Sequence, residues 1–143
     1  MYMDTFEIKY TGELSKDAND KMTLGHEKYE RENGIEINFN RFAFILSDEV
    51  GEVFGVLHAY TAYSEIYIED LWVDESLRRM GYGKKLVQAL ENHFKGSGYN
   101  NINLVTNEFQ APDFYKKCGY EIEFIRVNKD NNKLTKTFFI KYL

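Results

Sequence analysis

The feature that most constrains the fold of this chain is a β-favouring segment that runs through a polar turn into a glycine-spaced helix start. The segment IEDLWV at 68–73 is rich in β-branched and aromatic residues, residues 74–76 interrupt it, and RRMGYG at 78–83 opens an amphipathic stretch. The first turn of a helix leaves backbone N–H groups without partners, and glycines let a bulky polyanion approach them. The segment therefore predicts a phosphate or pyrophosphate site at a helix start. Four basic residues surround the turn, in a chain whose formal net charge is −5: Arg78, Arg79, Lys84 and Lys85.

The two glycines, Gly81 and Gly83, also fit a second interpretation, in which they allow the helix to pack tightly against its neighbours. Two known phosphate motifs do not match. The lysine and Ser/Thr of a P-loop do not follow Gly83, and the dinucleotide fingerprint needs a third glycine. The pattern that remains is RxxGxG, from Arg78 to Gly83.

The length of 143 residues is that of one domain, which we expect to span residues 1–143. No apolar run is long enough to span a membrane, and the N-terminal segment lacks the regions of a signal peptide, so we expect a cytoplasmic protein with no membrane partner. The single cysteine, Cys118, is typical of a reducing compartment. The acidic balance argues against nonspecific nucleic-acid binding, which needs a basic surface, and suits a cationic small substrate.

Hydrophobic periodicity and turn residues predict a mixed α/β chain. We expect strands at 5–10, 41–46, 52–60, 65–73, 101–106, 120–127 and 134–143, and helices at 15–32, 81–95 and 111–117. Gly25 could divide the first helix into two, and Asn33 with Gly34 should end it. Three consecutive strands predict an antiparallel meander, and the later strand–helix–strand crossing predicts one parallel pair in an otherwise antiparallel sheet.

Together with QAPDFYKKCGY at 110–120, the RxxGxG segment resembles the GNAT superfamily of acyl-CoA-dependent N-acyltransferases. The resemblance covers about half of the chain, from roughly Ile66 to Tyr120. It implies a GNAT fold of the α/β (α+β) class. In that fold a central, mixed and mostly antiparallel sheet of about seven strands is splayed open at the cofactor and flanked by about four helices.

The resemblance also implies acetyl-CoA as the acyl donor. The pantetheine arm would lie along the edge of the strand at 71–73, and the amides at 79–84 would hold the pyrophosphate. The family often carries an asparagine where this chain has Glu108, so Asn107 is the nearest candidate for that contact. The expected cofactor-binding residues are Leu71, Trp72, Val73, Arg78, Arg79, Met80, Gly81, Tyr82, Gly83, Lys84 and Asn107.

Glu69 is the candidate general base. The string YIEDLWV resembles the corresponding strand of diamine and polyamine N-acetyltransferases, where the glutamate sits beside the acceptor amine. A carboxylate can accept the proton that an ammonium must lose before it attacks. Strand alternation predicts that Glu69 and Asp70 point to opposite faces, with Asp70 as the substitute base. A plain edge-strand carboxylate is the alternative.

Tyr115 is the candidate general acid, because the resemblance implies that the tyrosine of FYKKCGY protonates the departing thiolate. A core aromatic is the alternative. Cys118 has no histidine near it in sequence, so we do not expect a covalent intermediate on its thiol. The three histidines have no metal-ligand spacing with one another or with Cys118, and no metal site is expected: His26, His58 and His93.

The sequence therefore predicts an enzyme that transfers an acetyl group from acetyl-CoA to a primary amine of a small molecule, directly within a ternary complex. Two alternatives stay open: an N-acetyltransferase of proteins or peptides, and a noncatalytic sensor of acyl-CoA. Many relatives are dimers, and the aromatic C-terminal strand could supply the edge for a homodimer.

Overall fold

The computed structural model of the chain describes residues 5–110 and 112–143. The chain divides into two compact units, one ending at Glu36 and the other spanning Ile37–Leu143. None of the helices in the described ranges is long and apolar enough to cross a membrane.

The described part of the first unit contains one helix, α1, at Lys16–Glu32. Ser15 caps it, because its side-chain oxygen accepts the N–H of Ala18 at 3.1 Å. The helix ends at Asn33 and at Gly34, which adopts a left-handed φ of +66°. The predicted division at Gly25 is wrong, since α1 runs through it without a break. A glycine inside a helix costs only about 1 kcal/mol relative to alanine, too little to end a helix that is well capped.

The strand predicted at 5–10 is also wrong, because these residues form no regular element. The side chains of Phe6, Ile8 and Tyr10 alternate with polar ones as in a strand, yet all three are exposed. Alternation alone does not make a strand, which also needs a neighbour for its backbone N–H and C=O groups.

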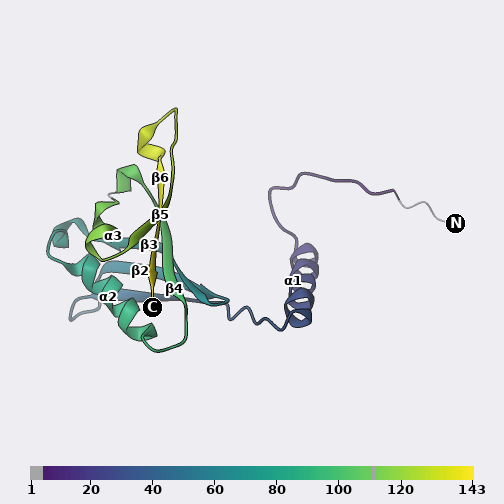
Figure 1. Cartoon of the computed structure of the whole chain (residues 1–143), viewed down its shortest axis with the longest axis horizontal. Coiled ribbons are helices and arrows are strands. Elements are labelled where there is room, and N and C mark those ends of the chain that lie inside the picture. The colour runs from purple at the N-terminus through teal and green to yellow at the C-terminus, as the bar shows by residue number, and fades with distance from the viewer. Residues whose placement is uncertain (1–4, 111) are drawn as a thin grey trace. The chain divides into compact units, whose positions relative to one another are not determined.

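The second unit is built on a six-stranded sheet in the order β1-β2-β3-β4-β6-β5 (Figure 1). The count is six rather than about seven because the predicted first strand is missing. The meander of β1, β2 and β3 is confirmed, and among the described strands only β3 and β4 pair in parallel. The strands are β1 Asn40–Ser47, β2 Val53–Ala62, β3 Glu65–Val73, β4 Asn101–Asn107, β5 Glu121–Arg126 and β6 Lys136–Tyr142.

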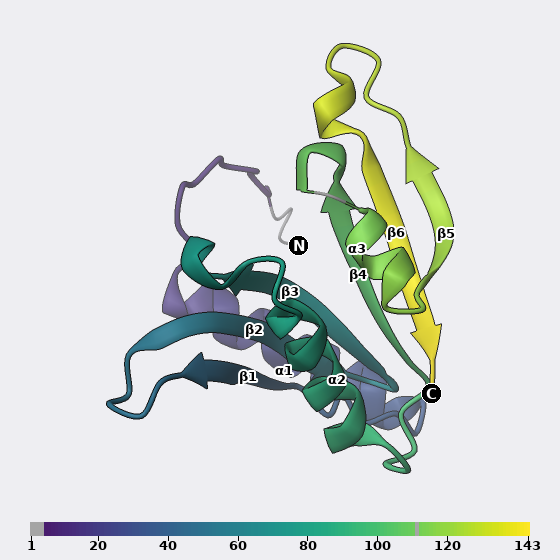
Figure 2. The same ribbon diagram turned by 90° about the vertical axis from the view of Figure 1, so that its left-hand side faces the viewer.

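The parallel pair is short, and this opens the sheet. Strand β3 pairs with β4 only where Glu65–Tyr67 meet Asn101–Asn103, although β3 continues to Val73 and β4 to Asn107. Figure 2 shows the two strands diverging from this point. The splay expected from the resemblance is thus confirmed, and beyond Tyr67 no strand within the described residues pairs with this edge of β3.

Helices α2 (Tyr82–Phe94) and α3 (Asp113–Lys117) lie on the same face of the sheet (Figures 1 and 2). Leu86, Val87 and Leu90 of α2 are buried in the core, where each apolar side chain contributes about 1.5–3 kcal/mol. Helix α3 begins after Pro112; Ala111, the predicted first residue, lies outside the described residues. Three short 3-10 helices were not predicted: Glu75–Leu77, Glu108–Gln110 and Asn132–Leu134.

Candidate functional site

The start of α2 has backbone donors without protein partners. Gly81 is the N-cap, with a left-handed φ of +84° and no side-chain cap. Within the helix, the first N–H to find a carbonyl is that of Lys85, which donates to Gly81 O at 3.1 Å. No described residue accepts the N–H groups of residues 82–84. These three amides point out of the first turn, where the helix dipole favours a negative charge.

The two glycines of the RxxGxG segment have different tasks. A Cβ on Gly81 would meet nothing within 4 Å, so this position needs glycine for its φ. A Cβ on Gly83 would lie 3.2 Å from two ring carbons of Phe114 and 3.9 Å from Val73 Cγ2. The tight-packing interpretation therefore holds for Gly83. The end of β3, the start of α2 and helix α3 converge on this one residue.

The basic residues of the turn include one with a defined partner. Arg78 Nε donates to the carbonyl of Val73 at 3.2 Å, which braces the turn between β3 and α2. That contact occupies one of the backbone groups expected to meet the pantetheine arm. Arg79 adopts a positive φ of +62°, and Lys85 Nζ lies 5.0 Å from the ring centroid of Tyr82.

Asn107 lies at the end of β4 and is held in a local turn. Its backbone N–H and its side-chain amide both donate to Gln110 Oε1, at 3.0 and 2.9 Å. The next residue, Glu108, donates its N–H to Thr135 O at 2.9 Å. The hydrogen bonds of Asn107 thus stabilise the turn that follows β4.

Glu69 is the extra residue of a β-bulge. In the pairing of β2 with β3, His58 faces Asp70 and Ala59 faces Ile68, so Glu69 has no register partner. The prediction that Glu69 and Asp70 point to opposite faces is wrong. One side-chain ligand atom from each of His58, Glu69 and Asp70 lies within 4.8 Å of the other two. A bulge puts two residues opposite one and so breaks strict alternation.

These carboxylates share the face of the sheet opposite α2 and α3 with two tyrosines. The rings of Tyr60 and Tyr67 lie 5.3 Å apart. Burial raises the pKa of Tyr67, and the neighbouring Tyr60, Glu69 and Asp70 raise it further. Among the described residues of the second unit, no helix covers this face. The face therefore combines two carboxylates, an imidazole and aromatic rings.

Sequence reasoning missed one further residue on this face. Arg41 of β1 forms an ion pair with Glu69, with Nη2 at 2.9 Å from Oε1. The only signal in the sequence was its outward position in an alternating strand, which it shares with many surface arginines.

Tyr115 is buried in the core on α3. Its ring packs against Phe114, Tyr120 and Phe139, with centroids 5.0–5.9 Å apart. The Tyr115 hydroxyl makes no hydrogen bond with a described residue. Because every fully buried side-chain oxygen among the described residues has a hydrogen bond, this oxygen is not fully buried. Burial raises the pKa of Tyr115 far above its usual range, with Cys118 as a smaller cause. The hydroxyl therefore stays protonated at neutral pH.

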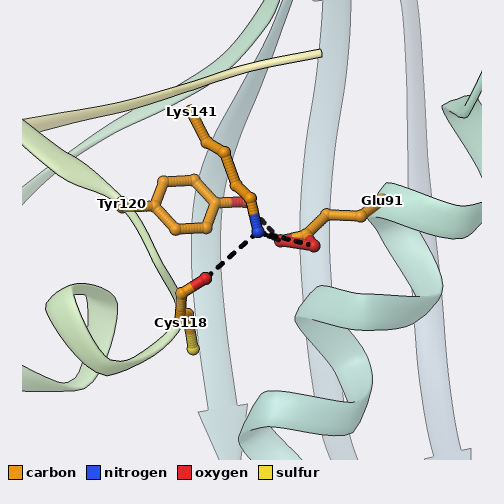
Figure 3. A network of polar contacts seen from close by, with 4 residues as sticks. All are labelled: Glu91, Cys118, Tyr120 and Lys141. Atoms are coloured by element: carbon orange, nitrogen blue, oxygen red, sulfur yellow. Dashed lines mark hydrogen bonds and ion pairs between the residues drawn. The ribbon is translucent and has the colours of Figure 1, made fainter.

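A polar network fixes the C-terminal end of α3 to α2 and β6 (Figure 3). Lys141 Nζ lies 3.1 Å from both carboxylate oxygens of Glu91 and donates to the carbonyl of Cys118 at 3.2 Å. The hydroxyl of Tyr120 donates to Glu91 Oε1 at 3.3 Å. Burial, followed by the charge of Glu91, raises the pKa of the Cys118 thiol, which disfavours the reactive thiolate.

A hollow of about 530 Å³ lies at the opposite end of α2, beside β1. Its apolar lining includes Phe42, Phe44, Phe94 and Tyr99. None of the residues expected to bind cofactor or to take part in catalysis lines it. The geometry at the splay, rather than this hollow, locates the candidate site.

Residues 9–120 match the model of the Acetyltransferase (GNAT) family. Blasticidin-S acetyltransferase from Streptomyces morookaense is 30% identical over 82 residues, which are 57% of this chain and 60% of that protein. The matched part thus spans less than two thirds of that relative.

Solved structures of acetyltransferases have the same fold as this chain. An acetyltransferase from Bacillus cereus has a TM-score of 0.78 at 28% identity, covering 94% of this chain and 98% of that one. An aminoglycoside 6′-N-acetyltransferase solved with coenzyme A has a TM-score of 0.61 at 20% identity, covering 90% and 92% of the two chains, and shares the fold. With a family match over residues 9–120 and a sheet splayed beside a glycine-spaced helix start, the chain belongs to the acetyltransferase (GNAT) family.

Proposed function

We propose that this protein transfers the acetyl group of acetyl-CoA to a primary amine of a small molecule, directly and within a ternary complex. The observation that carries the proposal is the unpaired edge of β3, which bears Glu69 and runs into the start of α2. A strand edge with free backbone groups can take an extended amide-bearing chain as an additional strand. The pantetheine arm of coenzyme A is such a chain.

The cofactor would lie along this edge with its pyrophosphate at α2. The free amides of residues 82–84 offer three donors, and each favourable contact with the helix dipole contributes up to about 1 kcal/mol at an exposed site. Arg79, Met80 and Lys84 flank them. The backbone of Leu71 and Trp72 remains for the pantetheine arm, since Arg78 holds the carbonyl of Val73.

The acceptor loses two protons overall. An ammonium gives one to Glu69, and the neutral amine attacks the thioester carbon. As the carbon–sulfur bond breaks, Tyr115 donates its hydroxyl proton to the departing sulfur and regains one from the new amide nitrogen. The products are the acetamide and the free thiol of coenzyme A, with one proton released through Glu69.

The raised pKa of Tyr115 affects how its proton can be transferred to the departing sulfur. Each unit by which the pKa of the donor exceeds that of the thiol adds about 1.4 kcal/mol to a stepwise transfer. A phenol made less acidic by burial is therefore a poor donor to a fully formed thiolate. Donation concerted with cleavage of the carbon–sulfur bond avoids this cost. We thus assign Tyr115 a concerted role.

Three observations support a small amine as the acceptor. Glu69 and Asp70 present two carboxylates on one face, which attracts a cation. The formal net charge of −5 has the same effect at longer range. Relatives of this chain are named for acetylation of blasticidin S and of aminoglycosides. A peptide amine is the alternative acceptor, because the face beside Glu69 is open in the second unit.

The first test is release of free thiol from acetyl-CoA by the purified protein with a panel of polyamines, aminoglycosides and amino acids. We expect turnover with at least one small amine, and mass spectrometry should find that amine heavier by the mass of one acetyl group. Preference for a lysine peptide over every small amine would favour the alternative acceptor. Silence across the panel despite tight cofactor binding would favour a sensor.

The residue roles have their own test. We expect Glu69→Gln and Tyr115→Phe each to lower kcat about 100-fold, the low end for loss of a general base or acid, with the affinity for acetyl-CoA unchanged. Calorimetry with acetyl-CoA checks the second point. Wild-type turnover in both variants would refute the assigned roles.

A further inference from the structure

Arg41 reaches Glu69 from two strands away. It is the register partner of Tyr60 on β2, which in turn faces Tyr67 on β3. Neighbouring strands lie about 4.8 Å apart, so the Arg41 side chain must cross the whole of β2 to reach a carboxylate on β3. Two nitrogens of its guanidinium meet Glu69 Oε1: Nε donates a hydrogen bond at 2.9 Å, and Nη2 lies at 2.9 Å in the ion pair. Few side chains other than arginine combine this length with two donors in one plane.

Aromatic rings hold the guanidinium over the sheet. Its central carbon lies 5.7 Å from the ring centroid of Phe39 and 6.0 Å from that of Tyr60. These two rings pack on each other at 5.5 Å. A cation at this distance from ring faces is attracted by the negative potential above the rings. The arginine is thus supported on its path as well as at its tip.

The bulge explains why Glu69 needs a partner. As the extra residue of β3, Glu69 has no register partner on β2, so regular pairing does not fix the direction of its side chain. The hydrogen bond from Nε and the ion pair with Nη2 both fall on Oε1, and no described residue donates a hydrogen bond to Oε2. The ion pair therefore restrains the carboxylate while leaving one oxygen available.

We propose that Arg41 is a positioning residue for acetyl transfer: it holds Oε1 of Glu69 so that Oε2 receives the proton of the acceptor amine. This inference rests on the proposed function of Glu69. Arg41 acts through Glu69 and contacts neither the acyl donor nor the reacting nitrogen. Its loss should lower the rate of the chemical step without weakening cofactor binding, because the cofactor contacts lie on α2 and the edge of β3.

A double-mutant cycle tests this dependence. We expect Arg41→Ala to lower kcat about tenfold while KM for acetyl-CoA stays unchanged, and the double variant Arg41→Ala/Glu69→Gln to be no slower than Glu69→Gln alone. Arg126→Ala is the matched control. Arg126 also lies over an aromatic ring, at 5.2 Å from the centroid of Phe138 on β6, and it is not near Glu69 in the sheet, so its loss should leave kcat unchanged.

Chemical rescue separates positioning from a structural role. Guanidinium at millimolar concentrations, well below denaturing levels, should restore much of the kcat of Arg41→Ala and none in Glu69→Gln or the double variant. Circular dichroism and cofactor affinity verify the fold of each variant. If Arg41→Ala does not fold, Arg41→Lys replaces it and should show an intermediate kcat, because it keeps the charge but loses the paired donors.

Several outcomes overturn the inference. These are a wild-type or faster kcat in Arg41→Ala, multiplicative losses in the double variant, or no response of Arg41→Ala to guanidinium. A faster kcat would mean that Arg41 competes with the acceptor cation for Glu69. A wild-type enzyme that acetylates no amine fails the proposed function instead, so the two failures are distinguishable.

Discussion

At the residue scale, Gly83 is the point where the start of α2 packs against Phe114 of α3. We expect Gly83→Ala to destabilise the protein by about 1–2 kcal/mol. The added methyl group would lie 3.2 Å from the Phe114 ring, and overpacking of this kind costs about 1–3 kcal/mol, more than the gain of up to about 1 kcal/mol in helix propensity. The midpoint of urea unfolding measures the change.

Two comparisons sharpen this experiment. Gly25→Ala makes the same exchange inside α1, where a Cβ would meet nothing within 4 Å, and should not destabilise. Phe114→Leu added to Gly83→Ala should cost less than the sum of the two single changes, because the smaller side chain leaves room for the methyl group. Strict additivity would show that contact with Phe114 is not the cause.

Sequence alone located several of these residues but not their tasks. The RxxGxG segment was identified as a helix start, yet whether each glycine serves its φ or its packing depends on Phe114, more than thirty positions away. The faces of Glu69 and Asp70 were predicted wrongly for a similar reason. A bulge is a mismatch between two strands, and the sequence of one strand does not contain it.

At the element scale, Lys141 ties β6 to α2 and to the end of α3. We expect Lys141→Met to lower the free energy of unfolding by about 1–2 kcal/mol, because Glu91 would keep a largely buried charge without its partner. The loss should fall short of the 3–5 kcal/mol of a fully buried pair, since a third of the Lys141 side chain is exposed. Urea unfolding again provides the measurement.

The surface pair Lys16–Asp20 is the control for that variant. Its atoms lie closer together, at 2.7 Å, but both side chains are exposed, so Lys16→Met should change stability by no more than about 0.5 kcal/mol. Equal losses in both variants would mean that burial is not what gives the Lys141 pair its importance. Recovery of stability in Lys141→Met/Glu91→Leu would support the explanation by a stranded charge.

Most elements were predictable because their patterns are local. The strands and helices of the second unit fall within a few residues of their predicted bounds, as alternation, turn residues and the apolar stripe of α2 require. The wrong predictions concern segments whose structure depends on interactions beyond the local pattern. Residues 5–10 have the pattern of a strand without forming one, and α1 tolerates Gly25 because its caps stabilise the helix as a whole.

At the scale of the whole molecule, the splay divides the sheet into two groups of strands, β1-β2-β3 and β4-β6-β5. Three residues of β3 paired with three of β4 are the contact between the two groups in the sheet. We expect acetyl-CoA to raise the melting temperature of the protein, because a ligand between the two groups binds only the folded state. At a hundredfold excess over Kd the gain is about 2.7 kcal/mol. Differential scanning fluorimetry measures it.

The same measurement with fragments of the cofactor tests the assigned positions. An acetylated pantetheine without the nucleotide should stabilise the protein much less than acetyl-CoA, since it lacks the pyrophosphate that the start of α2 would hold. Equal effects of the two compounds would move the cofactor away from that helix. The opening of the sheet itself was predicted through the family resemblance, because no local pattern specifies how far two strands stay paired.

The position of Trp72 has a practical consequence. It is the only tryptophan of the chain, 44% exposed, and it lies on β3 beyond the last residue that pairs with β4. The tryptophan emission of the protein therefore comes from a single indole beside the unpaired edge. Occupancy of that edge can be followed by ultraviolet fluorescence of the unlabelled wild-type protein.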